Sequence, residues 1–371
     1  MKSFFENKPQ VAVLLFVFLV VAFILSPFWL WQFKPERTLD ILIVDKTVPD
    51  QSYREHKGLT WVLNNEKYTK GNGEPYSAKE DYIGFKHETA HSYSEGRLPE
   101  KLDQYKVIYL ADLYGVYEEE IYGSIRNSAG SNSGLIYGGL LQEDVDKLEN
   151  ALVHGKKTLI AEFNTFGSPT EKAVRKQMTN LLNIHWTGWT GRYFSEMDGQ
   201  EVPEWIIDQY NLQTGKWDFQ GAGFVFVNVE NEIVVLGEQE LTGKGLNFVL
   251  TKQGNNFFKE NLGSKYRYWF DIIQPLNDDE VLAEYKLPVS KKAFGKLAGY
   301  GIPIQFPAVV HYENKHYSSY YFAGDYADEA EVPGIYQTVG LTLWRKKTEG
   351  DDSFYWSTYV PMMKRILYEG L

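Results

Sequence analysis

The sequence contains no cysteine and has a deficit of positive charge. The lack of a thiol excludes disulfides, thiolate metal sites, iron–sulfur clusters and cysteine nucleophiles. Lys and Arg number 38 against 49 Asp and Glu, which gives a formal net charge of −11. A chain this acidic lacks a general basic surface for nucleic acid, so we expect no nucleic-acid partner.

Motifs that bind phosphate or activate a serine are also absent. Gly221-Ala222-Gly223 precedes a strand-like run rather than a helix, so it does not match a dinucleotide-binding fingerprint. No G-x-S-x-G nucleophile motif occurs in the chain. We therefore expect no cofactor.

One long apolar run dominates the N-terminus. Residues 11–31 (VAVLLFVFLVVAFILSPFWLW) carry no charge, and as a helix they would cover about 31 Å, the thickness of a bilayer's hydrocarbon core. A cleaved signal peptide is the alternative, but the bulky Ser26-Pro27-Phe28-Trp29 offers no small-residue cleavage site. We expect a retained single-pass anchor in the cell membrane, with residues 1–10 as a short cytoplasmic tail and the C-terminal domain outside the cytoplasm.

Buried-strand and helix patterns alternate through the first half of the remaining chain. Such alternation is typical of a parallel sheet covered by helices on both faces. The strand-like runs are residues 39–45, 105–110 and 157–163, and the helical patterns are residues 53–65, 142–154 and 168–182. Short strands with tight turns then dominate up to about residue 290. The α/β pattern returns with strand-like runs at 305–310 and 320–323 and a helix from about residue 354. The expected division is therefore an α/β domain formed by residues 38–185 and 291–371, interrupted by a β-rich insertion at 186–290.

Four segments carry a resemblance to a known family: LDILIVD (39–45), YKVIYLADLYGVY (105–117), GKKTLIAEFN (155–164) and YYFAGDYAD (320–328). Their order resembles the class I glutamine amidotransferase-like superfamily, and more closely its ThuA-like and β-galactosidase-trimerisation-like branches. The resemblance covers residues 39–185 and 300–371. It implies a flavodoxin-like parallel sheet with helices on both faces.

The chain departs from this family at the residues that carry its chemistry. Glutaminases of the superfamily use an elbow cysteine and a His–Glu pair on a late strand. Here the elbow reads Ala161-Glu162-Phe163-Asn164-Thr165, and the late strand ends Phe322-Ala323-Gly324-Asp325. Neither a thiol nor a histidine is present at these positions, so glutamine hydrolysis through a thioester is excluded.

Polar residues follow the predicted parallel strands. Ligands of open α/β sheets bind beyond the carboxyl ends of these strands, where the sequence places Asp45, Asp112, Glu162, Asn164 and Asp325. Converging carboxylates could act as an acid/base pair in glycoside chemistry, hold a cation or bind sugar hydroxyls. Each could instead cap a helix or pair with an arginine. We take Asp112, Glu162, Asn164 and Asp325 as candidate ligand-binding residues.

Residues 185–194 (HWTGWTGRYF) combine aromatic rings with a guanidinium. Aromatic faces stack on the apolar faces of sugar rings, and arginine binds hydroxyl or carboxylate groups. Trp189 and Arg192 are therefore further candidate ligand-binding residues. A packed corner between the sheet and the insertion is the alternative.

His87-Glu88-Thr89-Ala90-His91 matches the H-E-x-x-H zinc pattern. On a helix, both histidines would face one side and Glu88 would serve as general base. The strand-like Tyr82–Phe85 before it and Gly96 and Pro99 after it leave little room for a helix. His87 and His91 are therefore weak candidates, and we favour no metal site.

Together these patterns predict a membrane-anchored, extracytoplasmic protein with a non-glutaminase amidotransferase-like domain. Its expected role is to bind a saccharide or envelope polysaccharide, or to assist cell-envelope or exopolysaccharide production. One alternative is a hydrolase that uses the strand-end carboxylates, or zinc held by His87 and His91. The other alternative is a scaffold subunit of a membrane complex.

The anchor can be tested by topology. A reporter fused after Leu371 should be active only on the outer face of the membrane, and the mature protein should retain residues 1–31 when its intact mass is measured. A mature N-terminus near residue 35 would show that the apolar run is a cleaved signal.

Overall fold

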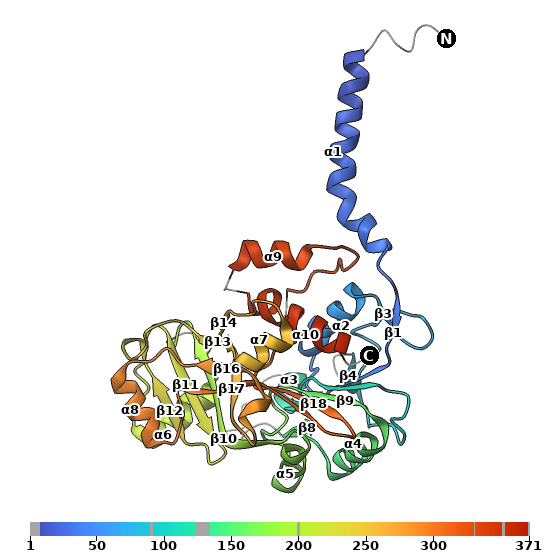
Figure 1. Cartoon of the computed structure of the whole chain (residues 1–371). Coiled ribbons are helices and arrows are strands. Elements are labelled where there is room, and N and C mark those ends of the chain that lie inside the picture. The colour runs from blue at the N-terminus through green and yellow to red at the C-terminus, as the bar shows by residue number, and fades with distance from the viewer. Residues whose placement is uncertain are drawn as a thin grey trace.

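The computed structural model describes residues 8–89, 92–122, 134–198, 201–329, 331–350 and 353–369. They form a mixed α/β domain below one long N-terminal helix (Figure 1). The helices are α1 (Lys8–Gln32), α2 (Arg54–Asn65), α3 (Glu118–Tyr122), α4 (Gln142–Gly155), α5 (Lys172–Leu181), α6 (Glu204–Thr214), α7 (Lys252–Phe258), α8 (Lys291–Gly299), α9 (Leu341–Glu349) and α10 (Val360–Glu369). A π-helical turn at Tyr355–Tyr359 leads into α10.

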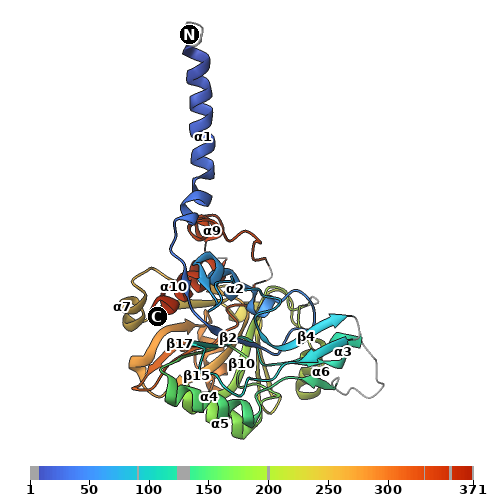
Figure 2. The ribbon, with the colours of Figure 1, turned by 90° about the vertical axis from the view of Figure 1, so that its right-hand side faces the viewer.

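A large mixed sheet forms the centre of the domain. Its strand order across the described residues is β14-β13-β16-β17-β18-β9-β6-β2-β4-β5. In that order the strands are Lys265–Tyr266, Leu246–Leu250, Val281–Lys286, Gln305–Glu313, Ser318–Phe322, Thr158–Ala161, Val107–Leu110, Ile41–Asp45, Ile83–Thr89 and Ser92–Glu95. The neighbours from β18 to β4 are parallel, and the outer strands pair antiparallel. Helices α2 and α10 lie on one face of the sheet and α4 and α5 on the other (Figures 1 and 2). The predicted α/β class is confirmed, although the sheet is mixed rather than parallel throughout.

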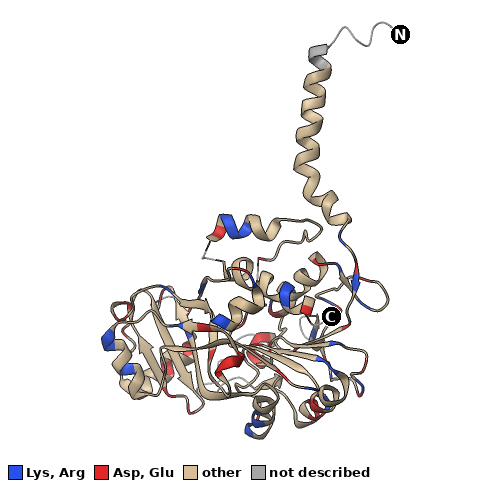
Figure 3. Cartoon of the chain, viewed as in Figure 1, with Lys and Arg blue, Asp and Glu red and all other residues tan. Residues whose placement is uncertain are grey.

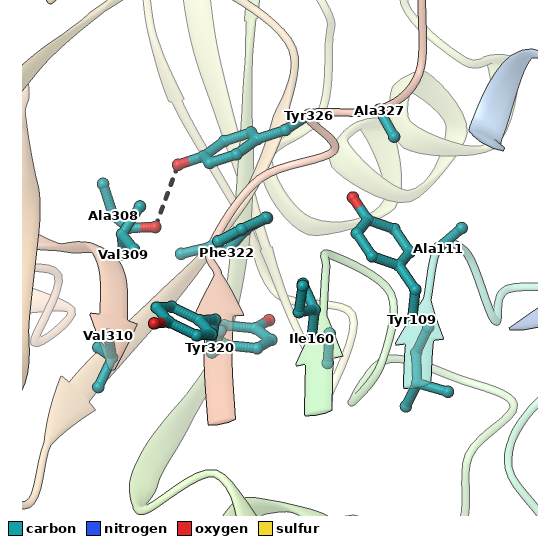
Figure 4. Packing of buried hydrophobic residues seen from close by; sticks show 14 of the residues in the cluster. Tyr109, Ala111, Ile160, Ala308, Val309, Val310, Tyr320, Phe322, Tyr326 and Ala327 are labelled. Atoms are coloured by element: carbon teal, nitrogen blue, oxygen red, sulfur yellow. Dashed lines mark hydrogen bonds between the residues drawn. The ribbon is translucent and has the colours of Figure 1, made fainter. Parts of the chain in front are cut away.

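The parallel strands are buried on both faces. All residues of β2, β6 and β9 are buried, which explains why these strands read as continuous apolar runs instead of alternating with polar residues. Their register aligns Leu42 with Ile108 and Ile108 with Leu159. Figure 4 shows the adjoining core, where Tyr320 and Phe322 from β18 lie beside Ile160 and where the Tyr326 hydroxyl donates to the Ala308 carbonyl.

A smaller antiparallel sheet packs beside the first. Its order is β12-β11-β10-β15, with bounds Ile233–Leu236, Gly223–Asn228, Ile184–Phe194 and Trp269–Pro275. Residues 186–290 thus supply this sheet, while β13, β14 and β16 from the same interval extend the large one. The remaining short strands pair as β1 (Arg37–Thr38) with β3 (Tyr68–Thr69), and β7 (Val116–Tyr117) with β8 (Leu135–Tyr137).

The end of α1 is fastened directly to the domain. The Trp31 side chain is buried, and its indole N–H donates to the carbonyl of Asn65 at the end of α2 (2.9 Å). The Lys67 ammonium lies 4.5 Å from the centre of the Trp31 ring. Residues 11–32 are long and apolar enough to cross a membrane, as a signal sequence near an N-terminus also is.

The pairing of β2 with β4 requires a glycine at position 84. A Cβ on Gly84 would lie 1.5 Å from the Asp45 carbonyl oxygen, so Gly84→Ala should lower the free energy of unfolding by at least about 1–3 kcal/mol. Gly295→Ala is the matched control, because a methyl group at this position in α8 would meet no atom within 4 Å outside its own helix backbone, and helix propensity predicts a gain of roughly 0.5–1 kcal/mol. Equal denaturation midpoints for the two variants would contradict this packing.

Candidate functional site

The carboxyl ends of β6 and β9 bring two predicted site residues together. The Asn164 side-chain amide donates to Oδ2 of Asp112 (2.9 Å). Oδ1 of Asp112 accepts from the Thr47 hydroxyl and from the Tyr114 backbone N–H, both at 2.7 Å. Asp112 is only 4% exposed, and burial raises its pKa to about 7 despite these hydrogen bonds. A carboxyl group with a pKa near neutrality can both give and take a proton.

Asp45, at the end of β2, has a structural partner. Its Oδ2 lies 2.5 Å from Nδ1 of His56, and both side chains are fully buried. The other ring nitrogen of His56 lies 2.7 Å from the Ala78 carbonyl, so it must carry a proton. Burial raises the pKa of Asp45 against the opposing effect of His56. This arrangement uses Asp45 to hold α2 against the sheet.

Glu162, directly after β9, is also buried in the core of the domain. Its side chain is 0% exposed, and one oxygen accepts from the hydroxyl of Tyr109 on β6. The other oxygen accepts from the backbone N–H groups of Tyr326 (2.8 Å) and Ala327 (3.1 Å). Burial raises the pKa of Glu162 to about 8. These three hydrogen bonds and the full burial leave Glu162 no free face toward a ligand.

Asp325 lies in a group of acidic residues that also includes Glu55 and Asp328. Its Oδ1 is buried and has no hydrogen-bond partner among the described residues. Burial and the neighbouring acids Asp328, Asp112, Glu162 and Glu55 raise the pKa of Asp325. Burial and the same kind of repulsion raise the pKa of Glu55 to about 10. Asp328 is paired with Arg54, whose Nε and Nη2 lie 2.6 and 2.7 Å from its two oxygens.

An aromatic hollow of about 410 Å³ opens beside Asn164, and we name it the tryptophan cleft. Its walls come from the turn after β9, the start of α5, the small sheet and α6. The aromatic lining residues are Tyr114, Phe163, Trp186, Trp205 and Trp269, and the polar ones include Asn164, Ser168, Arg175, Thr190, Asn228 and Asn231. Phe163 and Trp269 stack with their planes 11° apart, and Trp205 is 45% exposed. The cleft therefore offers apolar ring faces beside amide donors and acceptors.

A second hollow of about 380 Å³, the acidic cleft, lies beside Asp325. Its lining includes Tyr266, Tyr268, Asp325, Asp328 and Glu329. Tyr268 and Trp269 are adjacent in sequence but line different clefts, because successive residues entering β15 point to opposite sides.

Arg192 is not among the described lining residues of either cleft, but it contacts one ring from each. Its guanidinium carbon is 4.7 Å from the centre of the Tyr268 ring and 5.7 Å from that of Trp269. Nε of Arg192 is buried without a hydrogen-bond partner among the described residues. Cation–π contacts with rings from both clefts hold this residue in place.

Trp189 occupies a different environment from Arg192. It is 7% exposed and packs edge-on against Tyr300 with ring centres 6.3 Å apart. Its neighbours Gly188 and Thr190 line the tryptophan cleft, while Trp189 itself is not among the described lining residues. Strand alternation in β10 explains this, since it turns Trp189 to the core side.

The H-E-x-x-H segment does not adopt a helix over its described part. His87 and Glu88 belong to strand β4, so their side chains point to opposite faces. His91 lies outside the described residues. Glu88 accepts a hydrogen bond from the Ser92 hydroxyl (3.0 Å). Within the described ranges, no group of three or more His, Asp or Glu side chains is placed to hold a metal ion.

The sequence did not single out several residues of this region. Glu55 belongs to a helix whose polar residues carry no local motif, and only the fold brings it to Asp325. Asp328 lies three residues after Asp325 within the segment YYFAGDYAD, but it is not among the predicted site residues. Trp205 lies on α6, a helix inside the interval expected to be β-rich. Its 45% exposure is visible only in the structure, so the sequence offered no signal for it.

Comparisons with known proteins give distant matches. No protein-family model matches the chain, and no curated protein matches it in sequence. Among solved structures, it is similar to a polyextremophilic β-galactosidase from the Antarctic haloarchaeon Halorubrum lacusprofundi, with 10% identity, a TM-score of 0.35, and coverage of 79% of this chain and 28% of that one. It is also similar to Agd3, a novel carbohydrate deacetylase, with 11% identity, a TM-score of 0.29, and coverage of 78% and 30%. The chain thus spans less than a third of either protein, and its function is inferred from its own side chains.

The buried carboxyl of Glu162 predicts a pH-dependent stability. Its pKa rises from 4.5 to about 8 on folding, so between these values the folded state keeps a proton that the unfolded state releases. The contribution of Glu162 to the free energy of unfolding must therefore fall as pH rises through this window. Glu162→Gln mimics the protonated group, so its melting temperature relative to wild type should increase from pH 5 to pH 9.

Two further variants make this measurement specific. Glu196→Gln, at an exposed position, should follow the wild-type curve at every pH. Glu162→Ala should melt lower than wild type across the range, because it leaves two buried N–H groups unpaired. A Glu162→Gln curve parallel to that of wild type would show that Glu162 does not hold a proton in the folded state.

Proposed function

We propose that the chain is a membrane-anchored extracytoplasmic protein that binds a saccharide of the cell envelope in the tryptophan cleft. The observation that carries this proposal is the composition of that cleft, where Trp205 and the stacked pair Phe163–Trp269 share one hollow with several amide side chains. Sugar rings present C–H faces that pack on aromatic rings and hydroxyls that bond to amides. A volume of about 410 Å³ is within the usual range of small-ligand sites.

We further infer a non-glutaminase amidotransferase-like domain of flavodoxin-like topology. Numbered along the chain, the parallel strands β2, β4, β6, β9 and β18 lie in the order 2-1-3-4-5, which is the flavodoxin-like order. Asn164 occupies the elbow after β9 with φ of +67°. At this position it supplies an amide rather than a nucleophile, which supports binding over glutamine hydrolysis.

The anchoring proposal is supported by α1. Figure 3 shows that this helix carries no charged residue over residues 11–32. Basic and acidic residues follow near its junction with the domain. The side chains of residues 11–25 are almost all exposed, as a lipid-facing helix requires. The acidic bulk of the chain would then lie on the outer side of the membrane.

A hydrolase is the second candidate function, and one contact favours it. Asp112, with a pKa of about 7, is hydrogen-bonded to Asn164 at the wall of the tryptophan cleft. Only Asn164 would therefore separate a bound saccharide from a carboxyl group that is able to transfer a proton. In this reaction Asp112 would be the general acid or base.

Saccharide binding can be tested by calorimetry on the detergent-solubilised full chain with a panel of hexose and N-acetylhexosamine oligosaccharides. Trp205→Ala should weaken binding of the tightest ligand by about 1–3 kcal/mol, the scale of one lost stacking contact. A loss of about 1.4 kcal/mol raises Kd tenfold. Trp205 is partly exposed, so the melting temperature should change little.

Trp344→Ala is the control, because Trp344 is 57% exposed on α9 and is not among the described residues of either cleft. Unchanged affinity in Trp205→Ala would remove the tryptophan cleft as the site. Release of new reducing ends by the wild type, lost in Asp112→Asn while binding persists, would establish the hydrolase instead.

A further inference from the structure

Helix α9 is fastened beside the end of α1. The backbone N–H of Val339 donates to the carbonyl of Pro27 (3.1 Å), and Pro27 belongs to the uncharged run. Tyr336 packs edge-on against Trp31 with ring centres 6.0 Å apart. Helix α9 begins at Leu341, two residues beyond Val339. In Figures 1 and 2 it lies at the α1 end of the domain and runs across the direction of α1.

The two sides of α9 differ in their contacts. Toward the domain, Lys346 donates to the carbonyl of Asn261 (2.9 Å), and the Arg345 guanidinium lies 5.8 Å from the Trp356 ring centre. The exposed residues of α9 are instead Leu343 (59%), Trp344 (57%), Lys347 and Thr348. Their spacing places them on one side of the helix. That side is opposite the contacts with the domain.

Large exposed apolar side chains that share one side of a helix are typical of a surface that contacts a membrane or another protein. Ile335, in the segment before α9, is also 56% exposed. Helices with Trp and Leu on one side together with Lys lie in the plane of the membrane interface, and tryptophan favours the headgroup level. Because Val339 bonds to a residue inside the proposed span, a bilayer around α1 would reach α9 without any rearrangement.

We propose that α9 is an interfacial helix that rests on the bilayer crossed by α1. Leu343 and Trp344 enter the headgroup region, and Lys347 meets lipid phosphates. The helix has three basic residues against one acidic residue, which offsets locally the negative charge of the domain. This inference rests on the membrane anchoring proposed above, and it gives the domain a second point of attachment to the lipid.

The absence of native cysteine allows a direct test with single spin labels. Full-length Leu343→Cys would be labelled and placed in nanodiscs of phosphatidylcholine and phosphatidylglycerol. Electron paramagnetic resonance would then compare the accessibility of the label to oxygen, which concentrates in lipid, and to a neutral nickel chelate, which concentrates in water. Val17→Cys in α1 reports the lipid value. Leu212→Cys on α6, where Leu212 is 83% exposed, reports the water value.

We expect the ratio of oxygen to nickel accessibility at position 343 to exceed that at 212 severalfold and to approach that at 17. Equal ratios at 343 and 212, with a lipid value at 17, would overturn the interfacial helix and leave the anchor intact. Low accessibility to both reagents at 343 would also overturn it, because a protein surface such as a second copy would then cover α9. A water value at 17 would overturn the anchor itself, and the interfacial helix with it.

Discussion

The hydrogen bonds of one buried carboxyl group connect the parts of the fold that build the site. Glu162 joins β9 to Tyr109 on β6 and to the backbone of Tyr326 and Ala327 beyond β18. Tyr109 in turn contacts the hydroxyl of Tyr359, in the turn before α10, at 2.9 Å. Because this carboxyl is fully shielded from solvent, each partner would be left unsatisfied without the others. The position of the turn that carries Asp325 and Asp328 follows from these bonds.

Several acidic side chains with raised pKa values lie near these hydrogen bonds. The pKa values of Asp112, Glu55 and Asp325 are all raised by burial and by mutual repulsion. Two nitrogens of Arg54 donate hydrogen bonds to the two oxygens of Asp328. Acidic side chains with raised pKa values therefore lie close to an acidic side chain that is bound by arginine.

The central sheet could be predicted because strands that are buried on both faces appear in the sequence as continuous apolar runs. LDILIVD and KTLIAEF are apolar throughout their centres, and β2 and β9 form within them. The start of α5 was harder, since Ser168-Pro169-Thr170-Glu171 resembles a capping box while the helix begins at Lys172. The interval 186–290 reads as uniformly β-rich, yet its strands divide between two sheets. That division depends on long-range pairing, for which single-sequence periodicity contains no signal.

The sequence predicted where candidate site residues would lie, at the strand ends, better than which of them would face a cleft. Strand ends indicated Asp112 and Asn164, which do meet. The same reasoning could not separate them from Glu162, because the sequence does not show that the hydrogen bonds of Glu162 all go to the fold itself while Asp112 bonds to a residue that lines a cleft. Trp189 and Arg192 lie three residues apart in β10, and only the register of that strand turns Trp189 into the core. Trp205 reaches the cleft from a helix whose placement the local pattern does not specify.

The junction between α1 and the domain also affects how many molecules would act together. Trp31 is seated on the end of α2, so no flexible tether separates the helix from the domain. In a bilayer, neighbouring copies would share one tilt and differ only by rotation about the membrane normal. Helix α5, at the wall of the tryptophan cleft, lies at the end of the domain remote from α1 (Figures 1 and 2). Under the proposed anchoring and saccharide binding, a long polymer lying parallel to the membrane would engage several clefts at once, and weak individual contacts would add up to strong avidity.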